Sequence, residues 1–311
     1  MPVFKIQHIT KYEYDHLVKE SINEIRVLPY YCNDQEVLQQ SLSITGHPNV
    51  HSFIDYWGNQ VGTFSILAPH RELVIENRLM VRTVNPPATT TNYATGFDAL
   101  AKDVGIHLNM IELATPDRIA AAEAMETIVG EVQGTGESVA TTVETSSHYI
   151  YNNFQYIKGI TSVETTVDEI LNLRSGVCQD FAHVLLQMLR TMGIPSRYVS
   201  GYICPNKNGM RGEGATHAWV EAWIPGQGWA GIDPTNDVWV TNKHVKLAVG
   251  RNFNDCTPMK GTFKGQAEQK LSVYVSVAYE DGETFEELNR VDTGREKDKS
   301  ATPPEQEQPQ Q

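Results

Sequence analysis

The sequence lacks the features that would assign it to a membrane, a secretory route or a nucleic acid. It has no apolar run near the roughly 20 residues that a transmembrane helix needs. Its start, MPVFKIQHITKYEYD, lacks the basic, apolar and small-residue regions of a signal peptide. No basic patch is interleaved with aromatic residues, and the formal net charge is −13. We therefore expect a cytoplasmic protein that binds neither membranes nor nucleic acids.

Cysteine is scarce, and no metal-binding pattern is present. The four cysteines lie far apart and form no CxxC pair, which argues against a zinc knuckle and a redox dithiol. They are Cys32, Cys178, Cys204 and Cys256. The N-terminal histidines share no ligand spacing, and no carboxylate run has the spacing of a calcium loop. We expect four free thiols and no metal or cofactor.

Residues 1–88 predict an all-β domain. Residues 4–9 alternate apolar and polar side chains, as a half-buried strand does. Further predicted strands cover 22–27, 38–44, 50–56, 62–67 and 72–84. Several short strands bounded by turn residues are typical of a β-sandwich. The region holds no catalytic constellation, so we assign it a structural or partner-binding role.

The rest of the chain mixes helical and strand patterns. A proline- and threonine-rich linker precedes helical segments, one predicted to begin at Thr115 with Pro116 at its first position. Predicted strands follow at 196–204, 215–224, 229–232, 244–250 and 270–278. We group 89–285 as one α+β core with its preceding helices. Residues 286–311 are polar, acidic and rich in proline and glutamine, which predicts a disordered tail.

A cysteine stands at the start of the most apolar helix, in the segment 174–192, RSGVCQDFAHVLLQMLRTM. Gly176 predicts a turn, and Cys178 falls in the first helical turn after it. Gly193 ends the helix, as a C′ glycine does. A helix start presents free N–H groups and a positive dipole end, which favour a thiolate and can stabilise an oxyanion. Cys178 is thus a candidate nucleophile, with an ordinary buried thiol as the alternative.

Two downstream residues complete a candidate triad. His217 lies on the predicted strand 215–224, after a glycine-rich loop at 205–214 whose composition and position predict a lid. Asp233 ends the next strand of a predicted hairpin, within a few residues of register with His217. A weakly nucleophilic thiol needs a base, and the base needs a third group that sets its tautomer. Cys178, His217 and Asp233 together predict acyl transfer through a thioester.

Other residues near these three are weaker candidates. His183 is five residues beyond Cys178 on the same helix and points about 140° away from it, so we interpret it as structural. Asp180 is expected to support the helix start electrostatically. The dense tryptophans of this region are expected to pack in the core, and Trp219 is the best candidate among them to line a substrate cleft.

Four sequence blocks resemble the transglutaminase-like superfamily of cysteine enzymes. They are RSGVCQDFAH, GIPSRYVSGY, THAWVE and GWAGIDPTN, in the order found in that family. The later segment VGRNFNDCTPMKG resembles the bacterial branch, with Asn252 and Cys256 in place of an expected aspartate and aliphatic residue. The resemblance implies a papain-like core behind a β-rich N-terminal domain. It also implies Cys178 as nucleophile, His217 as general base and then acid, and Asp233 as the orienting carboxylate.

Three functions are weighed on this basis. We favour a cysteine-dependent enzyme that acts on amide bonds of peptides or proteins, and hydrolysis over cross-linking. A transamidating cross-linker is the first alternative, and a non-catalytic binding or assembly module that recruits a protein partner through the N-terminal domain is the second. Metal-dependent hydrolysis is disfavoured because the ligand spacing is absent.

Overall fold

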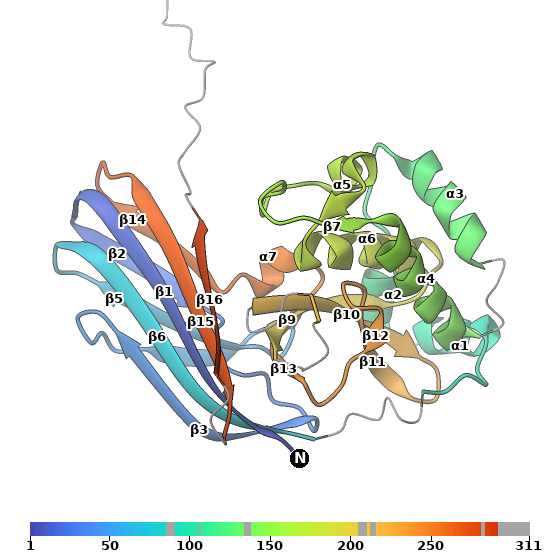
Figure 1. The fold of residues 1–311 in the computed structure, drawn as a ribbon, viewed down its shortest axis with the longest axis horizontal. Coiled ribbons are helices and arrows are strands. Elements are labelled where there is room, and N and C mark those ends of the chain that lie inside the picture. Colours follow the sequence, from blue (N-terminus) through green and yellow to red (C-terminus); the bar gives the residue numbers. More distant parts are fainter. Residues whose placement is uncertain are drawn as a thin grey trace, which may run out of the picture.

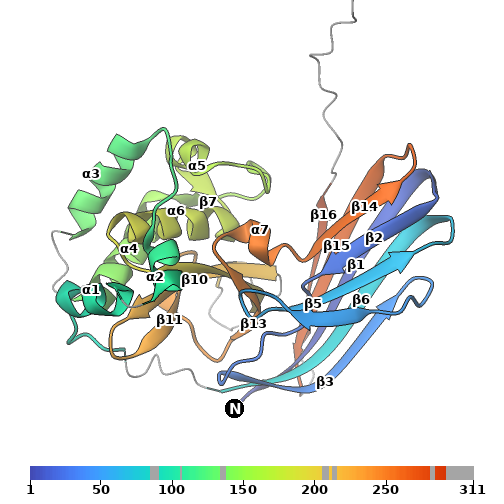
Figure 2. The same cartoon turned by 180° about the vertical axis from the view of Figure 1, so that it is seen from behind.

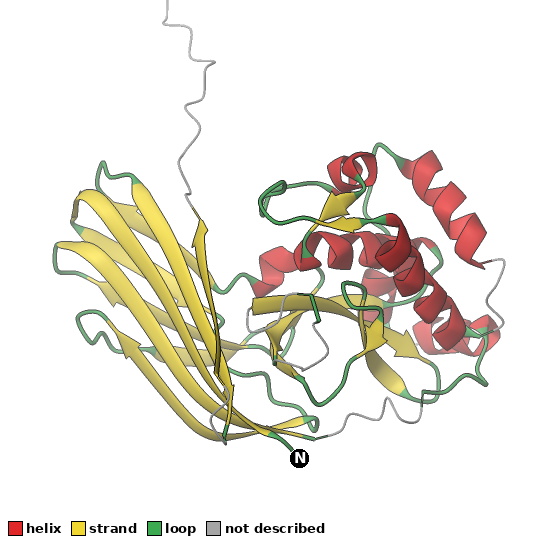
Figure 3. Ribbon diagram, viewed as in Figure 1, coloured by secondary structure: helices red, strands yellow, loops and turns green. Residues whose placement is uncertain are grey.

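The computed structural model describes residues 1–84, 91–105, 107–133, 138–204, 210–211, 216–280 and 284–291, the last without side chains. Figure 1 shows two parts side by side, one built of long strands and the other of helices around a shorter sheet. Colouring by secondary structure separates the two parts, since the described helices gather in only one of them (Figure 3). The predicted α+β class with a β-rich N-terminal region is confirmed.

The all-β part is a sandwich of two antiparallel sheets. The larger sheet has the order β16-β15-β1-β6-β3, and the smaller has the order β14-β2-β5-β4. The strands are Val3–Val18 (β1), Glu20–Ile25 (β2), Gln35–Ile44 (β3), His51–Ile54 (β4), Gln60–Ile66 (β5), His70–Thr83 (β6), Met259–Lys264 (β14), Gln269–Tyr279 (β15) and Thr284–Val291 (β16). The predicted N-terminal sandwich therefore has additional strands from the end of the chain.

Side chains that alternate between buried and exposed along the strands form the core of the sandwich. In β1, Phe4 and Ile6 are buried while Lys5 between them is exposed, as the two-residue period of a strand requires. Both sheets contribute apolar side chains to the core between them. The buried members are Tyr14, Val18, Ile25, Val27, Ile44, Phe64, Ile66, Leu73 and Ile75.

Strands β14, β15 and β16 correct the predicted domain grouping. The sequence pattern places residues up to 285 in the core and 286–311 in a disordered tail. Instead β15 pairs with β1 from Phe4↔Tyr279 to Tyr14↔Gln269, β14 pairs with β2, and residues 286–291 continue β16. The alternation of side chains along a strand shows its two faces but not the strand that it pairs with. The sequence pattern therefore does not predict that the end of the chain joins the sheets of the N-terminal sandwich. The predicted boundary at residue 88 lies outside the described residues.

The second part packs seven described helices around a five-stranded sheet. The helices are Phe97–Gly105 (α1), Leu108–Ala114 (α2), Ala122–Gln133 (α3), Val139–Asn153 (α4), Val167–Leu173 (α5), Cys178–Thr191 (α6) and Phe253–Cys256 (α7). The sheet has the order β12-β11-β10-β9-β13. Its strands are Ser196–Ile203 (β9), Thr216–Ile224 (β10), Gly228–Asp233 (β11), Val238–Trp239 (β12) and His244–Gly250 (β13). None of the described helices is long and apolar enough to cross a bilayer.

The predicted helix start at Thr115 is wrong. Thr115 is instead the C-cap of α2, and α3 begins at Ala122. Asp117 in the intervening segment forms ion pairs with Arg190 of α6 and with Arg251. These tertiary contacts hold the segment outside a helix, which overrides its local helix preference.

The two faces of the five-stranded sheet meet different partners. Ala218 and Val220 of β10 belong to the core built around α6. Trp219, between them, packs on the opposite face with Val199, next to Tyr30 of the sandwich region. A view from behind shows the chain leaving β13 through α7 and entering the sandwich at β14 (Figure 2).

Two amide side chains cover the outer edge of β13. The Gln35 amide donates to Lys246 O and accepts from Lys246 N, both at 2.8 Å. The Asn59 amide makes the same pair of bonds with Val249, at 2.8 and 2.7 Å. Each amide acts as a short piece of a neighbouring strand and satisfies buried backbone groups that an edge strand would leave unpaired. The sandwich thereby fixes β13 in place.

Candidate active site

The start of α6 is built from a short parallel strand pair and a buried carboxylate. Gln155–Tyr156 (β7) pairs with Ser175–Gly176 (β8), and Cys178 follows as the first residue of α6. Asp180 accepts hydrogen bonds at Oδ2 from Val177 N and Thr161 Oγ1, each at 2.7 Å. A Cβ at position 176 would lie 2.5 Å from that carboxylate, so only glycine fits. The helix start therefore presents a half-buried Cys178 on a fixed backbone.

Asp180 supports the helix start, as predicted, but mainly by a hydrogen bond to the preceding peptide. Burial raises the pKa of its carboxyl, while the bonds from Thr161 and Val177 act in the opposite direction. Its side chain connects α6 to the segment that contains Thr161.

The structure brings His217 and Asp233 into direct contact. His217 Nε2 lies 2.8 Å from Asp233 Oδ2, and both side chains are fully buried. Asp233 ends β11, which pairs with the strand that carries His217. Asn236 Nδ2 donates to the same Oδ2 at 2.7 Å, and Thr235 N donates to Oδ1 at 3.0 Å. The carboxylate is thus fixed by its own turn before it meets the imidazole.

The charged forms of His217 and Asp233 stabilise each other. Burial by itself lowers the pKa of His217, but the Asp233 carboxylate and the Cys178 side chain outweigh it and raise that pKa to about 10. Burial opposes the charge on Asp233 as well, yet the facing imidazole holds the pKa of this carboxyl far below its usual range. The site therefore favours an imidazolium on a carboxylate.

Cys178 meets the other side of the same ring. Because Nε2 of His217 bonds Asp233, Nδ1 is the nitrogen left for the thiol. Nδ1 makes no hydrogen bond of ordinary geometry, although the Cys178 side chain acts on the charge of His217. A loose thiol–imidazole contact of this kind is common in cysteine enzymes without substrate. The three predicted site residues therefore lie together, and their catalytic roles stay a prediction.

A second histidine on the Asp233 carboxylate was missed by the sequence analysis. His244 Nε2 lies 3.5 Å from Asp233 Oδ2, and His244 is buried at the start of β13. Thr241 N donates to His244 Nδ1 at 3.3 Å, so Nε2 carries the proton that points at Asp233. Burial lowers the pKa of His244, which keeps the ring neutral. Only the pairing of both β10 and β13 with β9 brings the two histidines together, and no sequence motif signals it.

These residues also have the chemistry of metal ligands. One ligand atom each from His217, Asp233 and His244 lies within 4.8 Å of the others. Two imidazoles and a carboxylate suit a transition metal. Their contacts with one another already occupy these atoms, and they fit the hydrogen-bonded triad without a metal. The expectation of no metal stays a prediction.

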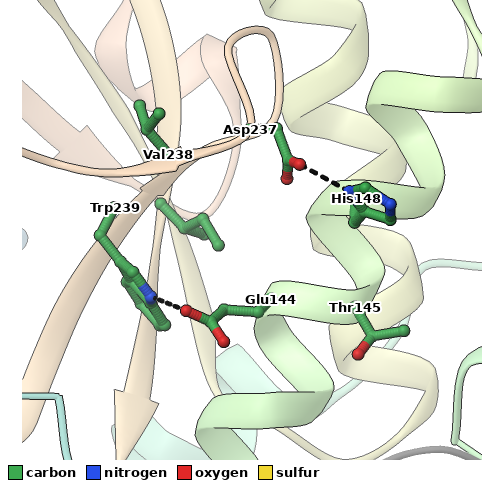
Figure 4. Close-up of a pocket in the computed structure, with 7 residues that line it drawn as sticks. Glu144, Thr145, His148, Asp237, Val238 and Trp239 are labelled. Carbon is green, nitrogen blue, oxygen red and sulfur yellow. Dashed lines mark hydrogen bonds and ion pairs between the residues drawn. The ribbon is translucent and has the colours of Figure 1, made fainter.

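The weaker candidates take structural positions. His183 Nε2 accepts a hydrogen bond from Phe253 N at 3.3 Å, and burial lowers the pKa of His183 to about 4. Trp219 is 1% exposed and stacks under His217 with ring centroids 6.4 Å apart, so it does not line an open cleft. Trp239 instead lines a cavity between α4 and the β11–β12 hairpin (Figure 4).

The predicted lid at 205–214 lies outside the described residues, apart from Met210 and Arg211. Arg211 N donates to Asn236 Oδ1 at 2.7 Å, and Asn236 Nδ2 donates to Arg211 O at 3.2 Å. The residue that bonds the Asp233 carboxylate thus also holds the backbone of this segment.

Comparisons with known proteins match the chain to two families. Residues 126–234 match the transglutaminase-like superfamily, and residues 4–82 match the bacterial transglutaminase-like N-terminal region. An uncharacterised protein of Mycobacterium leprae is 32% identical over 88% of this chain and 97% of its own length. A protein-glutamine gamma-glutamyltransferase of Pseudomonas aeruginosa is 39% identical over 83 residues, which cover 25% of this chain and 12% of that protein.

A solved structure extends the comparison to the whole fold. The crystal structure of "a Putative Cysteine Protease from Cytophaga hutchinsonii" matches with a TM-score of 0.71 and 23% identity. It covers 93% of this chain and 98% of the other chain. At this identity the match shows that the two chains share a fold.

Proposed function

Because the chain belongs to the transglutaminase-like superfamily, a family of cysteine-dependent enzymes, we propose that it transfers acyl groups from amide bonds of peptides or proteins. The single observation that carries this proposal is the buried His217–Asp233 pair, 2.8 Å apart, beside Cys178 at the start of α6. In this proposal Cys178 is the nucleophile, His217 the general base and then acid, and Asp233 the orienting carboxylate.

The residues support a two-step reaction. In the first step the sulfur of Cys178, whose proton His217 Nδ1 has already taken, attacks the amide carbonyl carbon. The free N–H groups at the start of α6 stabilise the oxyanion. The C–N bond then breaks, His217 returns its proton to the departing nitrogen, and a thioester to Cys178 remains.

In the second step a water molecule or an amine resolves the thioester. His217 takes a proton from this nucleophile and returns it to the sulfur as the C–S bond breaks. Asp233 stays ionised throughout and stabilises the imidazolium, as the carboxylate of such a triad does. The acid or new amide is released, and Cys178 regains its proton.

We favour hydrolysis over cross-linking, because nothing in the described site replaces water as the second nucleophile. The relative from Pseudomonas aeruginosa carries a transferase name, which keeps transamidation as the alternative. Glutamine-containing peptides, incubated with and without a labelled primary amine, separate the two. Release of ammonia or a cleaved peptide without label supports hydrolysis, and incorporated label refutes it.

The reactivity of the thiol tests the proposal before any substrate is known. At pH 6, iodoacetamide should modify Cys178 faster than the other three thiols, and His217→Ala should remove this difference. Cys32 is the matched internal control, since it is half-buried like Cys178 and burial raises the pKa of its thiol, and the fully buried Cys204 and Cys256 are the unreactive controls. If Cys178 reacts no faster than these controls, the catalytic proposal fails and the binding-module alternative takes its place.

A further inference from the structure

The Asp233 carboxylate has one hydrogen-bond donor that comes neither from its own turn nor from His217. Asn236 and Thr235, which bond its two oxygens, belong to the turn that follows β11. His244 stands eleven residues further along the chain, and its Nε2 lies 3.5 Å from Asp233 Oδ2. Among the hydrogen bonds that the described residues make to this carboxylate, only those from His217 and His244 come from other strands.

The ring of His244 is fixed independently of Asp233. His244 begins β13, where it pairs with Ile203 of β9. Thr241 N donates to its Nδ1 at 3.3 Å, which directs the Nε2–H toward the carboxylate. The ring of Trp219 meets it nearly edge-on, with centroids 5.2 Å apart, and the His244 side chain is fully buried. Because bulk water does not compete for a buried N–H, even a long hydrogen bond acts on the carboxylate here.

The same indole lies against both histidines of the site. Trp219 stacks with His217 at 6.4 Å between centroids and meets His244 at 5.2 Å. The two imidazole centroids lie 6.2 Å apart. The two imidazoles, the indole and the Asp233 carboxylate therefore form one packed group. A displacement of His244 reaches His217 through the shared carboxylate and through the shared indole.

A donor from another strand restrains the carboxylate in a way that its own turn does not. The terminal torsion of an aspartate is broad, so the carboxylate rotates readily unless donors hold it. Asn236 and Thr235 move with Asp233, since all three belong to one turn. His244 fixes Oδ2 relative to β13 and thereby sets where the acceptor of His217 lies. The orientation of the His217 ring toward the thiol depends on that acceptor.

We propose that His244 is a positioning residue of the acyl-transfer reaction, which acts through Asp233 to hold the His217 imidazolium against Cys178. The proposal rests on the acyl-transfer function above and adds a fourth side chain to the proposed triad. His244 exchanges no proton with the reactants, and its neutral ring donates the same hydrogen bond in both steps. What the reaction requires at position 244 is an N–H donor in the place of Nε2.

Two amides at position 244 separate the donor from its polar, buried surroundings. The amide nitrogen of His244→Gln reaches the place of Nε2 and can donate to Asp233, whereas the amide of His244→Asn is one methylene shorter and falls short of it. The measurement is the rate of Cys178 modification by iodoacetamide at pH 6 in the full chain. We expect His244→Asn to slow it about tenfold, the lower end of the range for a hydrogen bond to a charged group, and His244→Gln to restore most of the loss.

The hydrogen bond between His217 and Asp233 provides a second readout, which a general loss of packing at residue 244 would not move. The Nε2–H proton of His217, identified in the NMR spectrum by its loss in His217→Ala, should resonate downfield of the amide protons because its acceptor is a carboxylate. His244→Asn should shift this resonance, and His244→Gln should return it toward its native position.

His8 provides the matched control, because it is also a buried histidine with a hydrogen bond at each ring nitrogen. His8→Asn and His8→Gln should both keep the native rate. Equal rates in the two variants of residue 244, an unmoved His217 resonance in His244→Asn, or equal slowing in His8→Asn would overturn the proposal. If urea denaturation shows that neither variant of residue 244 folds, His244 serves folding and the positioning role is likewise overturned.

The native chain separates this proposal from the one on which it rests. If native Cys178 reacts no faster than the half-buried Cys32, the acyl-transfer proposal itself fails. If native Cys178 reacts faster and the two variants of residue 244 match it, only the role of His244 is refuted.

Discussion

Replacing Asp233 with asparagine should remove most of the proton affinity of His217. The folded protein raises the pKa of this imidazole from 6.5 to about 10, which corresponds to roughly 5 kcal/mol in favour of the imidazolium. Cys178 contributes part of this, so loss of the Asp233 charge removes less than the whole. Without the Asp233 charge, burial lowers the pKa of His217. The ring of the variant is then neutral at pH values at which the native protein holds the imidazolium.

The assay is the rate of Cys178 modification by iodoacetamide between pH 5 and 10. In the native protein the rate should be nearly flat from pH 6 to about 9. The His217 imidazolium keeps its proton throughout this range and so stabilises the Cys178 thiolate that reacts. In Asp233→Asn the rate at pH 6 should fall at least tenfold, and the profile should rise with pH as that of an ordinary thiol does. Asp98→Asn, an exposed carboxylate on α1, is the control and should keep the native profile.

Folding stability provides a second readout of the same interaction. The pKa of His217 is raised on folding, so its contribution is complete below pH 6.5 and is lost as pH rises toward 10. In Cys178→Ala, where no thiol ionisation offsets the His217 proton, the free energy of unfolding should therefore fall between these values by up to about 1.4 kcal/mol per pH unit, and adding Asp233→Asn should flatten this slope. An unchanged slope together with an unchanged rate profile would refute the assignment of Asp233 as the carboxylate that charges His217.

Three further changes test the supports of the site. Gly176→Ala places a Cβ 2.5 Å from Asp180 and should lower the free energy of unfolding by about 1–3 kcal/mol, measured by urea denaturation, and slow Cys178 modification. Gln35→Met leaves the buried N–H of Lys246 without its acceptor, while the Lys246 C=O keeps its bond from Tyr30 N, and should lower the free energy of unfolding by about 1–3 kcal/mol, with exposed Gln39→Met as control. His8 has a pKa lowered by burial to about 4, so it must be neutral in the folded protein, and stability is lost as pH falls from 6.5 toward 4. His8→Gln should reduce that acid-side loss in the same denaturation series.

The juxtaposition of Cys178, His217 and Asp233 was predictable because each stands in an informative local pattern. Cys178 stands at the start of an apolar helix, which the structure places at Cys178–Thr191, although Gly176 before it forms strand β8 rather than the predicted turn. His217 and Asp233 lie on adjacent strands of one hairpin, so a short-range pairing brings them together. These patterns depend on neighbours in the chain, which a single sequence does show.

The parts that were missed depend on long-range pairing. His244 meets Asp233 because β13 pairs with β9, which is separated from it by three other strands along the chain. Residues 259–291 extend sheets begun by the first strands, more than 200 residues earlier. Trp219 was the expected cleft residue, but the sandwich region covers its face of β10. Trp239 lines a cavity instead. Alternation indicates that a strand has two faces, but not which one stays open.

The sandwich supports the site although it contributes none of the three proposed catalytic residues. Gln35 and Asn59 hold the backbone of β13, and β13 begins with His244, which donates to Asp233. A shift of β13 would move this donor and free one side of the carboxylate that charges His217. The N-terminal domain therefore supports the geometry of the triad, whether or not it also recruits a partner. For this reason we expect Gln35→Met to lower the rate of Cys178 modification as well as stability, although residue 35 touches none of the three triad residues.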